Sequence, residues 1–365
     1  MQGYLRNKVG GVMFSSYKEE DVTILLKDIS GMVTPLSTKE REKRIQSGTH
    51  YSEMLPIEYA PTQEYIRIYN DTLEEHAQLT GHAVSKVAEK IIAKKGKNVI
   101  LVSLARAGIP IGILIKRYIE SKYAIKVTHY TISIIRGRGI DEVAMNYILE
   151  RHKAEDIQFI DGWTGKGAIL KELKKELQRY EGISDELAVL SDPAWITDMC
   201  GTHEDFLIPS SCLNATISGL LSRTFLHRDY IKPTDFHGAM FYKELMDQDV
   251  SYEFIDTVQK YFKYDIELEG KEGDIPNTRM GQCEVYKIAQ EFNIKDINFV
   301  KPGIGETTRV LLRRVPWKIL VKDKNDIKYL KHILRLAEEK NVEVMEYPLI
   351  AYRACGIIKD LSADL

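Results

Sequence analysis

A glycine-rich segment between a short apolar run and a helical pattern constrains this chain more than any other feature. The segment reads Asp161-Gly162-Trp163-Thr164-Gly165-Lys166-Gly167-Ala168. It follows the apolar run 157–160 and precedes residues 169–177, whose apolar side chains recur at helical spacing. The pattern predicts a strand, a tight loop and a helix. Such a loop gathers free backbone N–H groups at a helix start, which suits a phosphate, although an ordinary strand–helix turn gives the same pattern.

The alternation of strand and helix extends to both sides of this loop. Strand patterns at 99–104, 126–133 and 187–190 alternate with helical patterns at 113–121 and 142–152. This spacing is typical of a doubly wound parallel sheet, in which Asp161 would face the crevice at the carboxyl ends of the strands. A long helical pattern over 65–95 precedes it, and residues 192–262 give no clear order of elements.

Charge and cysteine content exclude several classes of protein. The net charge of −2 gives no global attraction to nucleic acid, so any such contact needs a local patch. The four cysteines are far apart and form no CxxC pair, which argues against a disulfide framework or a zinc site. No apolar stretch is long enough to cross a membrane, and the first residues do not resemble a signal peptide. We therefore expect a cytoplasmic protein that does not contact membranes.

Two loops carry a resemblance to a known enzyme superfamily. The segment 104–110, which contains Arg106-Ala107-Gly108, resembles the pyrophosphate loop of type I phosphoribosyltransferases. The segment 161–168 resembles their ribose-phosphate loop. Most of residues 20–260 also resembles the phosphoribosyltransferase proteins encoded with bacterial tellurite-resistance and stress-response genes (StiP-type), some of which carry a cysteine-protease label. The matching stretches include 50–56, 134–141, 205–214 and 235–239.

The resemblance implies an enzyme that uses phosphoribosyl pyrophosphate and Mg²⁺ to make or salvage a nucleotide-like product. Its catalytic residues would be Asp161, which holds ribose hydroxyls, and Arg136 and Arg138 on a flap over the pyrophosphate. The substrate-binding residues would be Arg106, Ala107, Gly108, Gly162, Thr164, Gly165, Lys166 and Gly167. The acceptor would be an unidentified base or nucleoside, and the candidates for its site are Cys212, Asn214 and His237. The ligands of a metal are not assigned.

The loop departs from the superfamily pattern, and two alternatives stay open. Gly162 replaces a second acid, so the site could bind phosphoribosyl pyrophosphate or a nucleotide as a sensor that acts through RNA without turnover. The other alternative is a cysteine peptidase with Cys212 as the thiol and His203, His227 or His237 as its base. Nothing in the spacing brings a histidine to Cys212, and a cysteine among Leu, Ile and Ser is usually a buried apolar residue.

The last 80 or so residues resemble the RNA-binding domain of the L7Ae/Pelota group. The resemblance rests on 300–309 and 317–321, with 347–350 and 353–357 matching that family's closing loop and helix. It implies contacts with structured RNA through Lys301, Gly303, Gly305, Glu306, Thr307, Arg309 and Arg313. Seven basic residues between Lys301 and Lys324, against two acids, suit phosphate contacts, although a solvated helix face gives the same pattern.

These observations predict an α/β protein with a type I phosphoribosyltransferase-like doubly wound sheet and a smaller L7Ae/Pelota-like α/β/α domain. We expect an N-terminal extension packed on the core (1–75), a phosphoribosyltransferase-like domain (76–265), a linker (266–281) and a Pelota-like RNA-binding domain (282–365). The expected activity is that of a glycosyltransferase coupled to RNA binding in a metal or tellurite stress response. A homodimer is left open.

Overall fold

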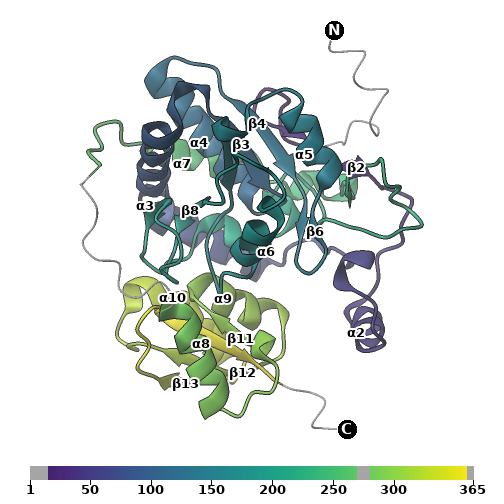
Figure 1. Ribbon diagram of the computed structural model, residues 1–365. Coiled ribbons are helices and arrows are strands. Elements are labelled where there is room, and N and C mark those ends of the chain that lie inside the picture. The colour runs from purple at the N-terminus through teal and green to yellow at the C-terminus, as the bar shows by residue number, and fades with distance from the viewer. Residues whose placement is uncertain (1–14, 269–279, 360–365) are drawn as a thin grey trace.

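The computed structural model describes residues 15–268 and 280–359. Most of the predicted linker, 266–281, lies outside the described residues. The described part forms a larger α/β body and a smaller C-terminal body packed against it (Figure 1). Among the described residues, no helix is long and apolar enough to span a membrane.

A parallel sheet of six strands forms the centre of the larger body. Its order is β1-β4-β3-β7-β8-β9, and all neighbouring pairs are parallel. The strands are β1 (Thr23–Ile24), β3 (Ile100–Leu104), β4 (Thr128–Ile132), β7 (Ile157–Ile160), β8 (Leu187–Ser191) and β9 (Cys200–Thr202). The α/β class and the parallel sheet predicted from the sequence are confirmed.

Helices cover both faces of this sheet because the strand residues are apolar on both sides. Leu101 of β3 belongs to one core cluster, with α3 and α4, whereas Val102 belongs to a second, with α5 and α6. The helices of this body are α2 (Thr38–Gln46), α3 (Gln63–Lys95), α4 (Gly108–Tyr123), α5 (Glu142–Leu149), α6 (Ala168–Leu177) and α7 (Ser251–Gln259). The predicted helix end at Gly96 is confirmed, since Gly96 follows α3 with a positive φ.

Short elements complete the larger body. Strand β2 (Lys27–Asp28) pairs with β10 (Gly238–Ala239), and β5 (Ile134–Ile135) forms a hairpin with β6 (Gly139–Ile140). Asn214, a candidate for the acceptor site, is not followed by an α-helix. Only a 3₁₀ turn forms at Ala215–Ile217, because the chain enters the left-handed region at Gly219 and Leu220. Further 3₁₀ turns span 51–53, 96–98, 154–156, 209–211, 243–248 and 297–299.

The smaller body has its own sheet of four strands, in the order β11-β14-β12-β13. Its elements are α8 (Met280–Glu291), β11 (Val300–Pro302), α9 (Ile304–Arg313), β12 (Pro316–Val321), α10 (Ile327–Glu339), β13 (Glu343–Glu346) and β14 (Ala354–Ile358). The helix expected near 353–357 is wrong. This segment is strand β14, which is central and antiparallel to both neighbours, because residues 354–357 are buried. The 3₁₀ turn at 297–299 leads directly into β11.

The two bodies are joined by helices α9 and α10, which face the larger body (Figure 1). The hydroxyl of Tyr65 on α3 donates to the carbonyl of Leu312 at the end of α9. The guanidinium of Arg313 donates to the carbonyl of Cys212 at 2.9 Å. The hydroxyl of Tyr329 on α10 donates to the carboxylate of Glu204 at 2.7 Å. These contacts leave a hollow along the side of α9.

Candidate functional site

The loops that follow β3 and β7 meet where the strand order reverses, as expected for a ligand crevice in an open α/β sheet. Gly108 opens α4 directly against β7, and a Cβ at this position would lie 2.5 Å from the carbonyl oxygen of Ile160. Only glycine allows this approach. The close contact brings Arg106, Ala107 and Asp161 to one edge of the sheet, where they line the same hollow.

This hollow, here called the interdomain cleft, has a volume of about 840 Å³ and lies between the loops of the larger body and α9. Seven basic residues and three acids line it. The basic residues are Arg41, Arg106, Arg223, Lys301, Arg309, Arg313 and Arg314, and the acids are Glu58, Asp161 and Glu306. The larger body supplies three of these cations and two of the acids, and the smaller body supplies four cations and one acid.

The cations of the interdomain cleft crowd one another. Burial, followed by repulsion from Arg41 and Arg106, lowers the pKa of Arg223 to about 10. Burial and repulsion from Arg309 lower the pKa of Arg313 to about 10. The pKa of Lys301 is lowered by burial as well. A bound anion would offset both effects, because it would replace lost hydration and screen like charges.

Asp161 is the first residue of the glycine-rich loop. Burial raises its pKa to about 7, although its carboxylate accepts a hydrogen bond from the N–H of Gly162 at 2.8 Å. The carboxyl group therefore changes charge near neutral pH. Its protonated form would add no negative charge to the cleft.

The polar groups of the glycine-rich loop contact the protein itself. The hydroxyl of Thr164 donates to Asp192, and the ammonium of Lys166 donates to the carbonyl of Ile297 at 2.8 Å. The hydroxyl of Tyr352 donates to the carbonyl of Gly165 at 3.0 Å. Burial lowers the pKa of Lys166 to about 8. Gly162 and Gly167 lie in the same loop, and Gly167 opens α6 with a positive φ. The loop therefore docks the smaller body.

The two arginines predicted to form a flap lie in the β5–β6 hairpin and point to different partners. Arg136 donates to the side chain of Asn298 in the smaller body at 3.2 Å. Arg138 forms an ion pair with Glu53 at 2.6 Å. Gly137 between them has a positive φ, which the tight turn requires. Neither arginine lines the interdomain cleft.

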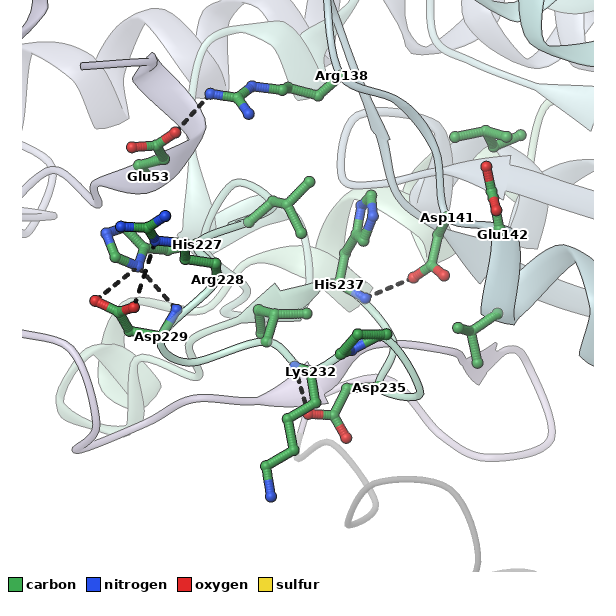
Figure 2. A pocket seen from close by; sticks show the side chains of 15 residues that line it. Glu53, Arg138, Asp141, Glu142, His227, Arg228, Asp229, Lys232, Asp235 and His237 are labelled. Atoms are coloured by element: carbon green, nitrogen blue, oxygen red, sulfur yellow. Dashed lines mark hydrogen bonds and ion pairs between the residues drawn. The ribbon is translucent and has the colours of Figure 1, made fainter.

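A second hollow of about 750 Å³ contains Arg138 and His237, here called the His237 pocket (Figure 2). The Nδ1 atom of His237 lies 2.9 Å from the hydroxyl of Ser133, and its backbone N–H donates to Asp141 at 2.6 Å. This pocket shares no lining residue with the interdomain cleft. The structure therefore separates His237 from Asn214, which lines the cleft and accepts a hydrogen bond from Arg313.

The residues predicted to bind RNA lie on β11, at the start of α9 and along α9. Lys301, Glu306, Arg309 and Arg313 line the interdomain cleft, whereas Thr307 is buried. Gly303 and Gly305 lie in a small hollow with Trp163, Asp205 and Ser211.

The helix start at Gly303 is closed by a carboxylate of the larger body. Asp205 accepts the N–H of Ile304 at 2.9 Å and that of Arg353 at 2.8 Å. Burial raises the pKa of Asp205 to about 6. A carboxylate thus occupies the position at the helix N-terminus where a phosphate would bind.

The cysteine chosen from the sequence is not paired with a base. Cys212 is fully buried, and its thiol donates to the hydroxyl of Thr72 at 3.9 Å. Burial raises its pKa to about 12, so the thiol stays protonated at neutral pH. Among the described residues, no hydrogen bond joins Cys212 to a histidine.

A different thiol, Cys200, does contact an imidazole. Its sulfur lies 3.5 Å from Nε2 and 3.9 Å from Nδ1 of His203. Because these distances are similar, the sulfur does not lie along the lone pair of a single nitrogen. Nδ1 of His203 contacts the carbonyl oxygen of Asp192 at 2.7 Å, and Trp195 stacks on the ring at 3.7 Å.

Sequence reasoning considered His203 but missed Cys200 and Asp192. The available signal was that His203 follows Cys200 by three positions, after Asp192 at the end of β8. The three side chains offer ligand atoms within 4.8 Å of one another. However, the carboxylate of Asp192 already accepts hydrogen bonds from Thr164, Ile196 and Thr197. A metal would have to compete with these donors.

Comparisons with known proteins show the family. The family model described as "Tellurite-like stress resistance cysteine protease StiP" matches residues 15–259, and the model "PELOTA RNA binding domain" matches residues 279–360. "Cysteine protease StiP" of Acinetobacter baylyi is 35% identical over 367 residues, which cover 95% of this chain and 94% of that protein. The chain belongs to the StiP family and carries a Pelota RNA-binding domain at its C-terminus.

The same comparisons correct the predicted enzyme class. The prediction of a phosphoribosyltransferase, a glycosyltransferase, is wrong, because both the family and the relative are named as cysteine proteases. The contacts of Thr164 and Lys166 supply a physical reason, since these groups bind Asp192 and Ile297 rather than remaining free for a phosphate.

Solved structures do not change this correction. Two crystal structures of a hypoxanthine-guanine phosphoribosyltransferase from Bacillus anthracis, one with HEPES in the active site, align with a TM-score of 0.24 and 16% identity. The alignments cover 32% of this chain and 66% of that chain. A structural similarity this low does not assign a fold family. The assignment of the sheet to the type I phosphoribosyltransferase superfamily therefore stays a prediction.

Proposed function

We propose that this member of the StiP family binds RNA in the interdomain cleft. The observation that supports the proposal is the crowding of seven cations against three acids in one hollow, with the pKa values of Arg223 and Arg313 lowered by burial and mutual repulsion. RNA carries the regular series of phosphates that such a surface neutralises. The Pelota domain supplies one wall of the cleft and therefore favours RNA among polyanions.

The expected binding surface includes both bodies. The N-terminus of α9 is closed by Asp205, so its backbone N–H groups are engaged while the bodies are packed together. Arg309 on α9 lines the cleft, and so does Arg106 on the loop after β3. RNA bound there would contact arginines of both bodies at once. The proposal here is RNA in general; the structured RNA expected from the sequence stays a prediction.

The full-length chain in a salt titration tests this function. We expect affinity for a labelled RNA, measured by fluorescence anisotropy, to fall steeply with salt as counterions are released. Arg309→Ala and Arg314→Ala should each weaken binding by about tenfold and reduce the salt slope by about one phosphate contact. Arg228→Ala is the matched control, since the Arg228 side chain is 96% exposed in the His237 pocket. Salt-independent binding, or equal losses in all three variants, would defeat the proposal.

Magnesium stays a prediction. The cleft acids Glu58, Asp161 and Glu306 offer the oxygen ligands that Mg²⁺ prefers, and phosphate oxygens would complete its coordination. Repeating the titration with Mg²⁺ and with a chelator measures whether the ion strengthens binding beyond its effect on ionic strength.

A second candidate function is thiol-dependent peptide hydrolysis centred on Cys200. The specific observation is the contact of its sulfur with His203, together with the name of the relative. In this mechanism, Nε2 would accept the thiol proton before sulfur attacks a peptide carbonyl. Cys200 is only 1% exposed, so the residues around it would have to move to admit a substrate.

Peptidase activity is tested with a mixture of fluorogenic peptides and two matched variants. Cys200→Ala should abolish hydrolysis, whereas Cys212→Ala should retain it, because Cys212 has no imidazole partner among the described residues. Activity that survives Cys200→Ala would exclude this thiol as the nucleophile. If Cys212→Ala alone abolished hydrolysis, the assignment would move to Cys212.

A further inference from the structure

One large aromatic side chain of the interdomain cleft is exposed. Tyr59 is 71% exposed and lines the cleft beside the arginines. Ile57, two residues earlier, lines the same wall and is 38% exposed. Exposed apolar surface inside a charged hollow is a feature of sites that take a ligand with both apolar and charged parts. A nucleotide has this character, since its base is a flat π surface and its phosphate is an anion.

The segment that carries Tyr59 is held at both ends. At its start, the N–H of Ile57 donates to the carbonyl of Leu36 at 3.1 Å. At its end, Thr62 caps α3, where its hydroxyl accepts from the N–H of Tyr65. Pro56 and Pro61 further restrict the backbone between these anchors. The ring of Tyr59 is therefore presented by a short, stiff segment, which reduces the entropy lost when a ligand stacks on it.

The cleft supplies phosphate and sugar contacts next to this ring. Arg309 and Arg314 line the same hollow as cations, and Asp161 and Asn214 line it as hydrogen-bond acceptors. A volume of about 840 Å³ is in the range of small-ligand sites, so that it accommodates unpaired nucleotides rather than a duplex. In a duplex, moreover, each base is covered on both faces by its neighbours, and none is free to stack on a tyrosine.

We propose that the interdomain cleft selects single-stranded RNA, with an unpaired base stacked on Tyr59 and the adjoining phosphates on Arg309 and Arg314. This inference rests on the proposed RNA-binding function and names its substrate class. Stacking on an aromatic ring tolerates any base, so the preference is for unpaired over paired RNA rather than for one sequence. The acceptors Asp161 and Asn214 can take a hydrogen bond from a ribose 2′-hydroxyl, which DNA lacks.

The test compares three variants on three probes with the full-length chain. The variants are Tyr59→Ala, Tyr59→Phe and, as a matched control, Tyr286→Ala, because Tyr286 is 63% exposed but lines neither the cleft nor the His237 pocket. The probes are an unstructured RNA of about ten nucleotides, a hairpin of paired RNA and the corresponding single-stranded DNA. A fluorescent adenine analogue in the unstructured RNA reports stacking directly.

Tyr59→Ala should weaken binding of the unstructured RNA by about tenfold, leave the salt slope unchanged and abolish quenching of the adenine analogue. Tyr59→Phe should keep both affinity and quenching, since the ring remains, and Tyr286→Ala should behave as the wild type. Wild-type protein should bind the hairpin and the DNA more weakly than the unstructured RNA.

Each failure points to a different conclusion. Equal affinity for unstructured RNA and hairpin, or an unchanged Tyr59→Ala variant, would overturn single-strand selection and leave RNA binding intact. Equal affinity for single-stranded DNA would overturn the assignment to RNA. Absence of salt-dependent binding to every probe would instead defeat the proposed function.

Discussion

The interdomain cleft and the His237 pocket are similar in volume but opposite in charge. In the cleft, seven cations face three acids, and all of these cations except Arg314 are half-buried. In the pocket, three cations (Arg138, Arg228 and Lys232) face five acids (Glu53, Asp141, Glu142, Asp229 and Asp235). Figure 2 shows Arg138 pointing to Glu53 there, and Asp235 forms a further ion pair with Lys27 at 2.7 Å. Volume alone does not distinguish the two hollows.

The difference shows which hollow holds cations without an acidic partner for their charge. Arg138 already has its counterion in Glu53, so that a ligand gains little by binding to it. Arg309 of the cleft pairs with Glu306 at 3.6 Å. Among the described residues, however, Arg223 and Arg313 donate only to neutral acceptors, the carbonyls of Met54 and Cys212 among them. These partners satisfy hydrogen bonds but not charge. An anion in the cleft would therefore gain much more than one in the pocket.

The largest expected effect comes from charge reversal in one hollow and not in the other. Arg309→Glu combined with Arg314→Glu should weaken RNA binding by about a hundredfold or more, because two attractive contacts become repulsive. Arg228→Glu in the His237 pocket should change affinity by less than about twofold. Fluorescence anisotropy at fixed salt measures both. A similar loss in the two proteins would mean that the whole surface attracts RNA and would remove the distinction between the hollows.

The second prediction uses the fact that residues of both bodies line the cleft, whereas residues of the larger body alone line the His237 pocket. Asp205→Ala leaves the N–H groups of Ile304 and Arg353 without their acceptor at the interface, which should lower stability by about 1–3 kcal/mol. Thermal unfolding measures the loss, and hydrogen exchange should increase in α9 but not around His237.

Asp247→Ala is the control for this prediction, because Asp247 is exposed in the larger body. Exchange that increases equally around His237 would show general destabilisation rather than separation of the bodies. Unchanged exchange in α9 would mean that Asp205 does not hold the two bodies together.

The parts of the fold that follow from local sequence were predicted well. Strand β7 was predicted at its observed bounds, and the long helical pattern over 65–95 corresponds to α3. Strand β14 was mistaken for part of a closing loop and helix, because a run of small and apolar residues carries no period that separates helix from strand. Its place in the sheet is decided by long-range pairing with β11 and β12.

The candidate site was predictable only where its residues follow a strand. The positions of Arg106 and Asp161 after β3 and β7 placed them together at the sheet edge. The packing of the two bodies could not be read from the sequence, because it depends on single contacts such as Asp205 with Ile304. The same packing buried the predicted turn at Gly303 and placed Tyr59 in one hollow with residues of α9.

The third prediction concerns the pH dependence of RNA binding. It tests the interdomain cleft alone, because Asp161 lines the cleft and not the His237 pocket. Because burial raises the pKa of Asp161 to about 7, lowering the pH from 8 to 6 neutralises this carboxylate and removes a negative charge from the cleft. RNA affinity should rise by roughly three- to tenfold over that range. Asp161→Asn should bind at pH 8 about as tightly as the wild type binds at pH 6, with a flatter profile. A profile that keeps its full slope in Asp161→Asn would assign the titration to another group.

The smallest expected effect belongs to Arg138, which the sequence placed on a flap over a bound pyrophosphate. Its side chain is 45% exposed and paired with Glu53, so Arg138→Ala should cost less than about 1 kcal/mol of stability. The change should also leave RNA affinity within about twofold of the wild type, because the cleft does not include this residue. Glu53→Gln is the sharper partner experiment, since it leaves the Arg138 charge without its counterion. If the cleft and the pocket are independent, neither variant alters RNA binding. A tenfold loss in Arg138→Ala would instead mean that the β5–β6 hairpin moves over the bound ligand and that the two hollows act as one site.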